Sequence, residues 1–269
     1  MKVITLPVAP RPFEWHRWQA LTWMEAVLPG ARAAFSTRLG GVSEGAYREL
    51  NIGLLTDDDP QLVRHNRALL AAAVDRDPSG VAIGLQVHGT EICTRREPPA
   101  PSAYAERLTA PAKADAQLTD HVAVTPLVLV ADCFPLVLAT PGAVAAVHCG
   151  WRGIAAGIVA SAVQSLCHLR ATEPAEVGAA VGPGIGPCCY EVGPEVERAF
   201  AERGHGQEVA GRGRLDLAGA IRSELEQAGL PSQSVHAAGL CTSCHPDLFF
   251  SHRRDGGVTG RQAGLAWLT

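Results

Sequence analysis

The sequence lacks the features of a membrane-spanning, secreted or nucleic-acid-binding protein. Its apolar runs, such as Leu127 to Ala131, are far too short to span a bilayer. The N-terminal residues contain no apolar core followed by a small-residue cleavage site, so they do not predict a secretory signal. The basic residues form no block and the net charge is −4, which gives no electrostatic reason to expect binding to nucleic acid or to an anionic membrane. We therefore expect a cytoplasmic protein.

The chain also lacks internal repeats, low-complexity segments and an obvious linker. Its 269 residues, 47% of them hydrophobic and 19% charged, are typical of a globular protein with a substantial core. We predict a single domain of residues 1–269, with residues 1–30 as an N-terminal segment packed on its body. No exposed apolar stripe stands out, so we expect a monomer. The eight cysteines, without a signal peptide, indicate reduced thiols rather than a disulfide framework.

Predicted strands and helices alternate along the chain. Asp59 and Pro60 are typical of a helix N-cap and first helical position, and they precede the helical residues 62–74. Strands are predicted over residues 81–88, on both sides of Asp132-Cys133, up to His148, and over 177–181. Helices are predicted over residues 154–170 and over 217–228, the latter capped by Asp216. This order indicates an α/β or α+β fold, with a mixed β-sheet core flanked by helices.

His88, Cys133 and His148 each stand at the end of a predicted strand, where reactive side chains are common. Zinc accepts imidazole nitrogen together with thiolate sulfur, and a site with three protein ligands keeps an open position for a water or substrate. The intervals of 45 and 15 residues match no short zinc-finger pattern, however. A lone histidine at a strand end is also more often an ordinary core or surface residue than a ligand. Residue type and spacing therefore leave both interpretations open.

Several longer segments carry a resemblance to a known family. In order along the chain they are FSTRLGGVSEGAYRELNIG, QVHGTEI, KADAQLT, ADCFPLVLA, AVHCGWRG, AVGPGIGPCCYEVG and FFSHRRDGGVTGRQ. From about Phe35 to its C-terminus the chain resembles the laccase-domain family, also called multicopper polyphenol oxidases, which is associated with purine nucleoside phosphorylase activity. The resemblance implies that a catalytic metal is held by the histidine of QVHG, the cysteine of ADC and the histidine before GWRG. In this sequence these are His88, Cys133 and His148.

The resemblance also implies an activity. In the expected reaction, phosphate cleaves adenosine, inosine, guanosine or methylthioadenosine to the free base and ribose-1-phosphate (its 5-methylthio derivative from methylthioadenosine), with adenosine deaminase activity beside it. Zinc is the expected metal, although copper could replace it because copper ranks above zinc in affinity. The expected partners are small molecules, namely purine nucleosides and phosphate.

Four arginines are candidates for binding the phosphate, because a guanidinium group matches phosphate oxygens. Arg38 lies in a polar, glycine-rich loop, and Arg152 follows His148 by four residues, so we predict both as pocket residues. Arg253 and Arg254 lie near a further glycine turn, and each of the four could equally form a surface ion pair. Glu91 and Asp132 are candidates for proton transfer or for orienting a ligand.

Three alternatives to the phosphorylase are considered. A copper-dependent phenol oxidase of the multicopper type is disfavoured, because none of the ten histidines forms a His-x-His or His-Cys-His pair. A cysteine hydrolase or deamidase could use Cys133 as nucleophile and His148 as base. A non-enzymatic, zinc-stapled binding module is the third, although a chain of this size needs no metal in order to fold.

Other motifs predict structural roles. Cys241 and Cys244 precede His245 with the spacing of c-type haem attachment, but that reaction requires export. No second Cys-x-x-Cys pair lies nearby to complete a zinc site, so a turn with reduced cysteines is favoured. The neighbours Cys188 and Cys189 are expected to be structural, although one could line the pocket. The glycine run of residues 182–187 matches no phosphate-binding motif and predicts a tight turn with glycines at positive φ.

Overall fold

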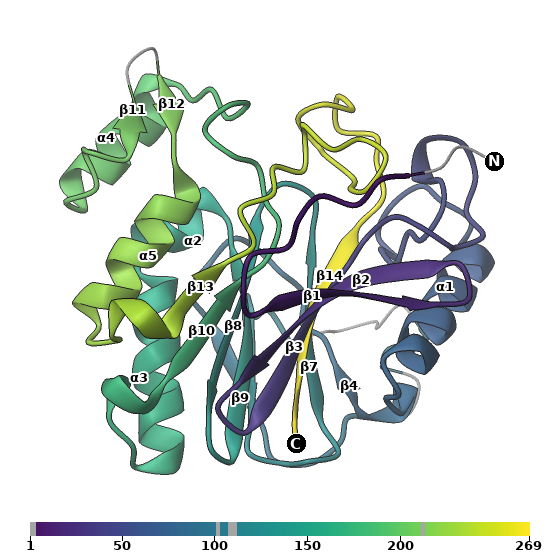
Figure 1. Ribbon diagram of the computed structural model, residues 1–269, viewed down its shortest axis with the longest axis horizontal. Coiled ribbons are helices and arrows are strands. Elements are labelled where there is room, and N and C mark those ends of the chain that lie inside the picture. Colours follow the sequence, from purple (N-terminus) through teal and green to yellow (C-terminus); the bar gives the residue numbers. More distant parts are fainter. Residues whose placement is uncertain (1–3, 101–102, 107–111, 211–212) are drawn as a thin grey trace.

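The computed structural model describes residues 4–100, 103–106, 112–210 and 213–269. Two six-stranded sheets face each other, and helices cover their outer faces, so the fold has four layers (Figure 1). In spatial order the first sheet contains β1 (Phe13–Trp18), β2 (Leu21–Leu28), β3 (Ala31–Ser36), β14 (Gln262–Leu268), β7 (Thr125–Val130) and β4 (Val81–Ala82). The second contains β13 (Val235–Ala237), β10 (Gly178–Val181), β8 (Phe134–Thr140), β9 (Ala143–Cys149), β6 (Ala116–Thr119) and β5 (Ile92–Arg95). Both sheets are mixed, because β4–β7, β10–β13 and β5–β6 are parallel pairs.

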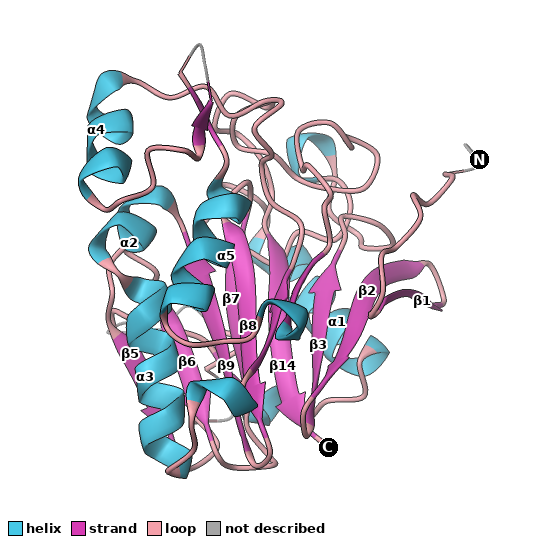
Figure 2. Ribbon diagram, turned by 60° about the vertical axis from the view of Figure 1, so that its left-hand side comes forward, coloured by secondary structure: helices cyan, strands magenta, loops and turns pink. Residues whose placement is uncertain are grey.

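The helices divide between the two outer faces. Helix α1 (Pro60–Ala73) packs on the first sheet, whereas α2 (Trp151–Ala156), α3 (Ile158–Arg170) and α5 (Leu217–Gln227) pack on the second (Figure 2). Helix α4 (Pro194–Glu202) and the hairpin of β11 (Val209–Ala210) and β12 (Arg214–Leu215) lie at one end of the molecule (Figure 1). Short 3-10 helices cover Gly45–Tyr47, Pro78–Gly80, Pro174–Glu176 and Ser232–Ser234. In the described part of the chain, no helix has the length and apolar character needed to cross a membrane.

Strands β8 and β9 are buried along their whole length. On one face of these strands Val137, Ala139 and Val144 pack against the first sheet. On the other face Leu138 and Val147 pack against α3 and α5. A strand covered on both faces has no solvent-facing positions, which explains why these segments show continuous apolar runs instead of alternation.

The predicted fold class is confirmed, with two facing sheets as its mixed β-sheet core. The side chain of Asp59 accepts a hydrogen bond from the N–H of Gln61 and Pro60 opens α1, as predicted. Asp216 accepts from the N–H of Gly219 and so caps α5. The N-terminal segment supplies β1 and β2, the two strands at one edge of the first sheet.

Several local predictions need correction. The helix expected over 154–170 is two helices, because Gly157 adopts φ 95° between α2 and α3. The strand expected over 81–88 is limited to Val81–Ala82, with an isolated bridge from Leu85 to Lys113. Helix α4 was not predicted.

The glycine run 182–187 is also explained differently. None of its three glycines has positive φ. A Cβ on Gly182 would lie 2.2 Å from the ring of Phe35, and one on Gly184 would lie 2.6 Å from the ring of Phe134. These glycines are required for close packing against aromatic rings, not for a left-handed turn.

Candidate functional site

His88, Cys133 and His148 come together although they lie far apart in the sequence. His88 is in the loop after β4, Cys133 is in the turn from β7 to β8, and His148 is on β9. In the turn from β7 to β8 the chain passes from the first sheet to the second, so residues of both sheets meet there. The three possible ligand atoms all lie within 4.8 Å of one another, and Cys133 Sγ is 3.9 Å from His88 Nε2. The imidazole rings meet edge to face, with centroids 4.8 Å apart.

Asp115, just before β6, holds two of these residues in place. Its buried carboxylate accepts hydrogen bonds from the backbone N–H groups of Val87, His88 and Gly89, each at 2.9 Å. It also lies 2.8 Å from His148 Nδ1. If Nδ1 donates to the carboxylate, Nε2 of His148 is left with its lone pair available to a metal. This carboxylate–histidine pairing is the usual arrangement behind a metal-bound histidine.

Sequence reasoning did not identify Asp115 as a site residue. It stands inside the quoted segment KADAQLT, immediately before a buried strand. An acidic side chain in that position is a weak signal, and nothing in its spacing connects it to the two histidines.

Two residues of the site have left-handed backbone conformations. His88 has φ 60° and Asp132 has φ 89°, which is unusual for residues other than glycine and is often found at functional sites. Asp132 is held by Thr242 Oγ1 at 2.6 Å and by the N–H of Arg253 at 2.7 Å. Asp132 therefore fixes the turn that carries Cys133. Glu91 is exposed and does not line the cavity described below.

Cys133 and His148 form an electrostatically coupled pair. Burial alone would raise the pKa of the Cys133 thiol, but the charge of His148 and hydrogen bonds from both histidines lower it to about 6. Burial alone would lower the pKa of His148, but the Cys133 charge and the bond to Asp115 raise it to about 9. Near neutral pH the metal-free pair is therefore a thiolate beside an imidazolium. The thiolate is the form of cysteine that binds metals.

Gly150 allows this close arrangement. A Cβ at this position would lie 2.7 Å from Cδ2 of His88 and 3.2 Å from Sγ of Cys133. Its φ of −86° would suit any residue, so the requirement for glycine is one of space. The side chains of His88 and Cys133 are thus packed directly against the backbone of Gly150.

The cluster opens into a cavity of about 560 Å³, a volume in the usual range for small-molecule sites. Two aromatic side chains, Trp151 and Tyr190, lie on its wall. Burial and the charge of Cys133 raise the pKa of Tyr190 to about 12, so its hydroxyl remains protonated at neutral pH. The rest of the lining includes an apolar group, Leu54, Ile83, Leu85 and Leu129, and a basic group, Arg67, Arg152, Arg253 and Arg261.

The two arginines predicted as pocket residues, Arg152 and Arg38, differ in their position relative to the cavity. Arg152 lines the cavity with its guanidinium over the Trp151 ring, 4.3 Å from the centroid. Arg38 is not brought to the cavity, because its guanidinium donates to the carbonyl groups of Arg48 and Pro246 and lies over the ring of Phe250. Its hydrogen-bonding capacity is used to hold the loop, which is the physical reason for its absence from the site.

The side chains of Arg253 and Arg254 also point to different places. Arg253 lines the cavity over the ring of Tyr190, whereas Arg254 is directed to Asp255 and to nearby backbone carbonyls. Arg261 was missed by sequence reasoning, yet it lines the cavity while donating to the carbonyls of Thr259 and Gly260. It stands before β14, more than 100 residues after His148, and no local motif marks it.

The chain was compared with known proteins. The family model described as multi-copper polyphenol oxidoreductase laccase matches residues 32–269. Purine nucleoside phosphorylase YlmD of Geobacillus stearothermophilus is 35% identical over 260 residues, covering 90% of this chain and 93% of that protein. A purine nucleoside phosphorylase of Deinococcus radiodurans is 41% identical over 233 residues, 85% of each chain. The crystal structure of hypothetical protein YfiH from Bacillus licheniformis matches with a TM-score of 0.88 at 31% identity, covering 97% of this chain and 100% of that one.

The resemblance found in the sequence is thus confirmed by the family match, by the relatives and by the fold. The His88–Cys133–His148 cluster could hold a metal ion, as the convergence of its ligand atoms indicates. The chain belongs to the multi-copper polyphenol oxidoreductase laccase family.

Proposed function

We propose that this protein is a zinc-dependent purine nucleoside phosphorylase. In its reaction, phosphate cleaves the glycosidic bond of a purine nucleoside to give the free base and ribose-1-phosphate. The observation that carries the proposal is the convergence of His88, Cys133 and His148 at a cavity that arginine and aromatic side chains also line. The relatives that are named purine nucleoside phosphorylases support the same reading.

The donor set supports zinc as the metal. Two imidazoles and one thiolate suit a borderline ion, and three protein ligands leave the open position typical of catalytic zinc. When bound, zinc would act as a Lewis acid toward an oxygen atom of phosphate or water. A multicopper oxidase needs a further cluster rich in histidine. Among the described residues, the only other group able to hold a metal consists of four cysteines, which disfavours that chemistry.

The protein's own residues would bind the substrates. Arg152, Arg253 and Arg261 place positive charge around the cavity, where phosphate must be held against the sugar. The rings of Trp151 and Tyr190 offer flat apolar surfaces for a purine, and the protonated Tyr190 hydroxyl can donate to it. Asp115 keeps both histidines oriented without touching the substrate.

Phosphorolysis then follows from this arrangement. A phosphate oxygen bonds to C1′ of the ribose as the bond from C1′ to N9 of the purine breaks. The departing base takes the bond's electron pair and a proton, and the ribosyl centre passes through an oxocarbenium-like state. Fixed guanidinium groups that hold phosphate in position beneath C1′ lower the barrier by orientation and by charge stabilisation.

Adenosine deamination is the second reaction that we propose for this site. It exchanges the 6-amino group of adenine for the oxygen of water and releases ammonia. Inosine and ammonia, formed without phosphate, are therefore its diagnostic products.

The experiment incubates zinc-loaded protein with adenosine, inosine, guanosine or methylthioadenosine, each with and without phosphate, and separates the products by chromatography. We expect free base and ribose-1-phosphate (5-methylthioribose-1-phosphate from methylthioadenosine) only with phosphate, and loss of both products in His88→Ala. His168→Ala, on the exposed side of α3, is the matched control and should behave as the wild type. If no purine nucleoside is converted under any condition, the proposal is wrong.

One observation favours a second candidate, a cysteine hydrolase. Cys133, His148 and Asp115 form a chain of nucleophile, base and orienting carboxylate, and the Cys133 thiol has a lowered pKa. The dependence of activity on metal distinguishes the two candidate functions. A hydrolase would work without metal and be inactivated by alkylation of Cys133, whereas the phosphorylase would lose activity on metal removal and regain it with zinc.

A further inference from the structure

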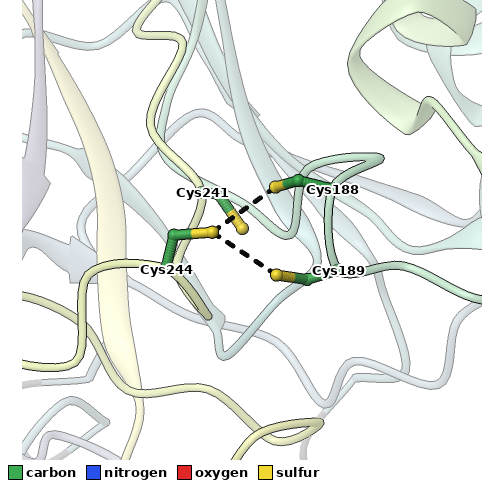
Figure 3. Close-up of side chains that lie close together, drawn as sticks. All are labelled: Cys188, Cys189, Cys241 and Cys244. Carbon is green, nitrogen blue, oxygen red and sulfur yellow. Dashed lines mark hydrogen bonds between the residues drawn. The ribbon is translucent and has the colours of Figure 1, made fainter.

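Four cysteines meet at a second place in the molecule, outside the His88–Cys133–His148 cluster. Cys188 and Cys189 lie in the turn between β10 and α4, and Cys241 and Cys244 lie in the segment after β13. Figure 3 shows the four side chains pointing toward a common centre. Their sulfur atoms all lie within 4.8 Å of one another, and Cys244 Sγ is 3.4 Å from the sulfur atoms of both Cys188 and Cys189.

The backbone holds the two segments in register. Gly184 and Cys241 form an isolated parallel bridge, in which the N–H of Gly184 donates to the carbonyl of Leu240 and that of Thr242 to the carbonyl of Gly184. A Cβ on Gly186 would lie 3.3 Å from Cys188 Sγ and 3.4 Å from Cys241 Cβ, which is closer than most Cβ contacts. The convergence of the sulfurs is therefore built into the backbone.

We propose that Cys188, Cys189, Cys241 and Cys244 bind a zinc ion as a structural tetrathiolate site. Zinc–sulfur bonds of about 2.3 Å in tetrahedral geometry place the sulfur atoms about 3.8 Å apart. The sulfur atoms here, with two separations of 3.4 Å and none above 4.8 Å, bracket that value. Four soft sulfur ligands favour zinc, or an iron–sulfur centre, over hard cations.

A hydrogen bond to sulfur supports the same assignment. The N–H of Gly186 donates to Cys241 Sγ at 3.2 Å. Such a bond offsets the negative charge that accumulates on a tetrathiolate centre and orients the ligand. The separation of Cys241 from Cys244 by two residues is the usual ligand spacing in structural zinc sites.

The arrangement fits other uses of cysteine less well. All eight cysteines are free, and sulfur atoms at 3.4 Å are well beyond the disulfide bond length of about 2.05 Å. Cys244 is equally close to Cys188 and Cys189, which suits a shared ion rather than one chosen disulfide partner. His245 faces the carbonyl of Cys241 and the ring of Phe249, so the haem-attachment interpretation gains no support.

The spacing of the four cysteines in the sequence did not predict this site. The chain has no second Cys-x-x-Cys pair beside Cys241 and Cys244. The other two proposed ligands, Cys188 and Cys189, are adjacent in sequence and lie 56 and 55 residues before Cys244. Only the pairing of the segments around Gly184 and Cys241 brings them together.

The site would connect a segment that lines the cavity with one that supports a residue of its wall. Cys189 immediately precedes Tyr190, which is on the cavity wall. Thr242, between the other two ligands, holds Asp132 beside Cys133. Four protein ligands leave no open position, so the metal would fix these segments rather than take part in the reaction.

The experiment measures metal content and the Co²⁺ spectrum of the full chain, purified under reducing conditions with zinc. We expect two zinc ions per chain, one for each cluster. Cys244→Ser and Cys188→Ser should each lose one ion, and Cys133→Ala should lose the other. Cys167→Ser, a cysteine on α3 outside both clusters, is the matched control and should keep two. These variants separate the failure of this site from the failure of the proposed catalytic site.

The visible spectrum of Co²⁺-loaded protein tests the same site without the serine variants, which is needed if those variants fail to fold. Cys133→Ala protein loaded with Co²⁺ should show the intense visible absorption of tetrahedral Co²⁺ bound by four thiolates. The proposal is overturned if wild-type protein holds a single zinc that Cys133→Ala removes, if Co²⁺-loaded Cys133→Ala protein lacks that absorption, or if mass spectrometry finds the four cysteines joined as disulfides under those conditions.

Discussion

Substitution of Asp115 by Asn should weaken metal binding at the His88–Cys133–His148 cluster by about 10–100-fold. The wild-type carboxylate accepts four hydrogen bonds, three from backbone N–H groups and one from His148 Nδ1. The amide of Asn is nearly isosteric, but its NH₂ group would face N–H donors and leave some of them unpaired. The loss in affinity corresponds to about 1.4–2.7 kcal/mol of binding free energy.

The same substitution should also lower the free energy of unfolding. Asp115 is fully buried, and an unsatisfied buried donor costs about 1–3 kcal/mol. We expect a total loss of about 2–4 kcal/mol, since the loop around His88 can relax and the individual costs do not add.

Zinc affinity would be measured by competition with a chromophoric chelator, and stability by urea unfolding of the metal-free protein. Asp57→Asn, at an exposed position in the loop before α1, is the matched control and should change neither quantity. If Asp115→Asn binds zinc as tightly as the wild type while Asp57→Asn behaves normally, Asp115 does not orient the ligands and the reasoning is refuted.

Three further substitutions test other parts of the structure. Gly150→Ala should lower zinc affinity by at least about tenfold in the chelator assay, because the new methyl group meets His88 and Cys133; unchanged affinity would show that the ligands can move aside. Arg152→Ala should raise the KM for phosphate by about tenfold with little change in melting temperature, since its guanidinium lies over the Trp151 ring at the cavity wall; an unchanged KM would remove it from the phosphate site. Burial opposes ionisation of Glu224, but hydrogen bonds from Arg203 and His205 outweigh burial and lower the pKa of its carboxyl group. The ionised carboxylate therefore stabilises the fold above about pH 4.5, and this stabilisation is lost as the pH falls through the lowered pKa of the folded state. Glu224→Gln should therefore lower the free energy of unfolding by about 2–3 kcal/mol at pH 7 and flatten its fall in acid, as followed by urea unfolding between about pH 3 and 7; a variant with the wild-type acid profile would contradict this assignment.

Local signals in the sequence predicted local structure well. Helix α1 begins where Asp59 and Pro60 indicate, and Asp216 caps α5, because capping depends on residues only a few positions apart. The break at Gly157 was missed, since an apolar periodic pattern tolerates a glycine without showing which φ it adopts. The division of the strands into two facing sheets depends on pairings between distant segments, such as β3 with β14, which no local pattern encodes.

The candidate site shows the same limit. His88, Cys133 and His148 could be singled out because their residue types and family motifs are distinctive. Asp115 and Arg261 could not, because an aspartate before a strand and an arginine near the C-terminus have no local feature that points to the cavity. Arg38 had a plausible setting, but the carbonyls of Arg48 and Pro246 occupy its guanidinium.

The most direct test of the account is the formation of ribose-1-phosphate from inosine and phosphate by metal-stripped protein before and after zinc is returned. We predict no product from the stripped protein, recovery on addition of zinc, and no recovery in Cys133→Ala. Equal turnover by the stripped protein, or zinc-restored turnover in Cys133→Ala, would contradict the claim that the His88–Cys133–His148 cluster is the catalytic metal centre.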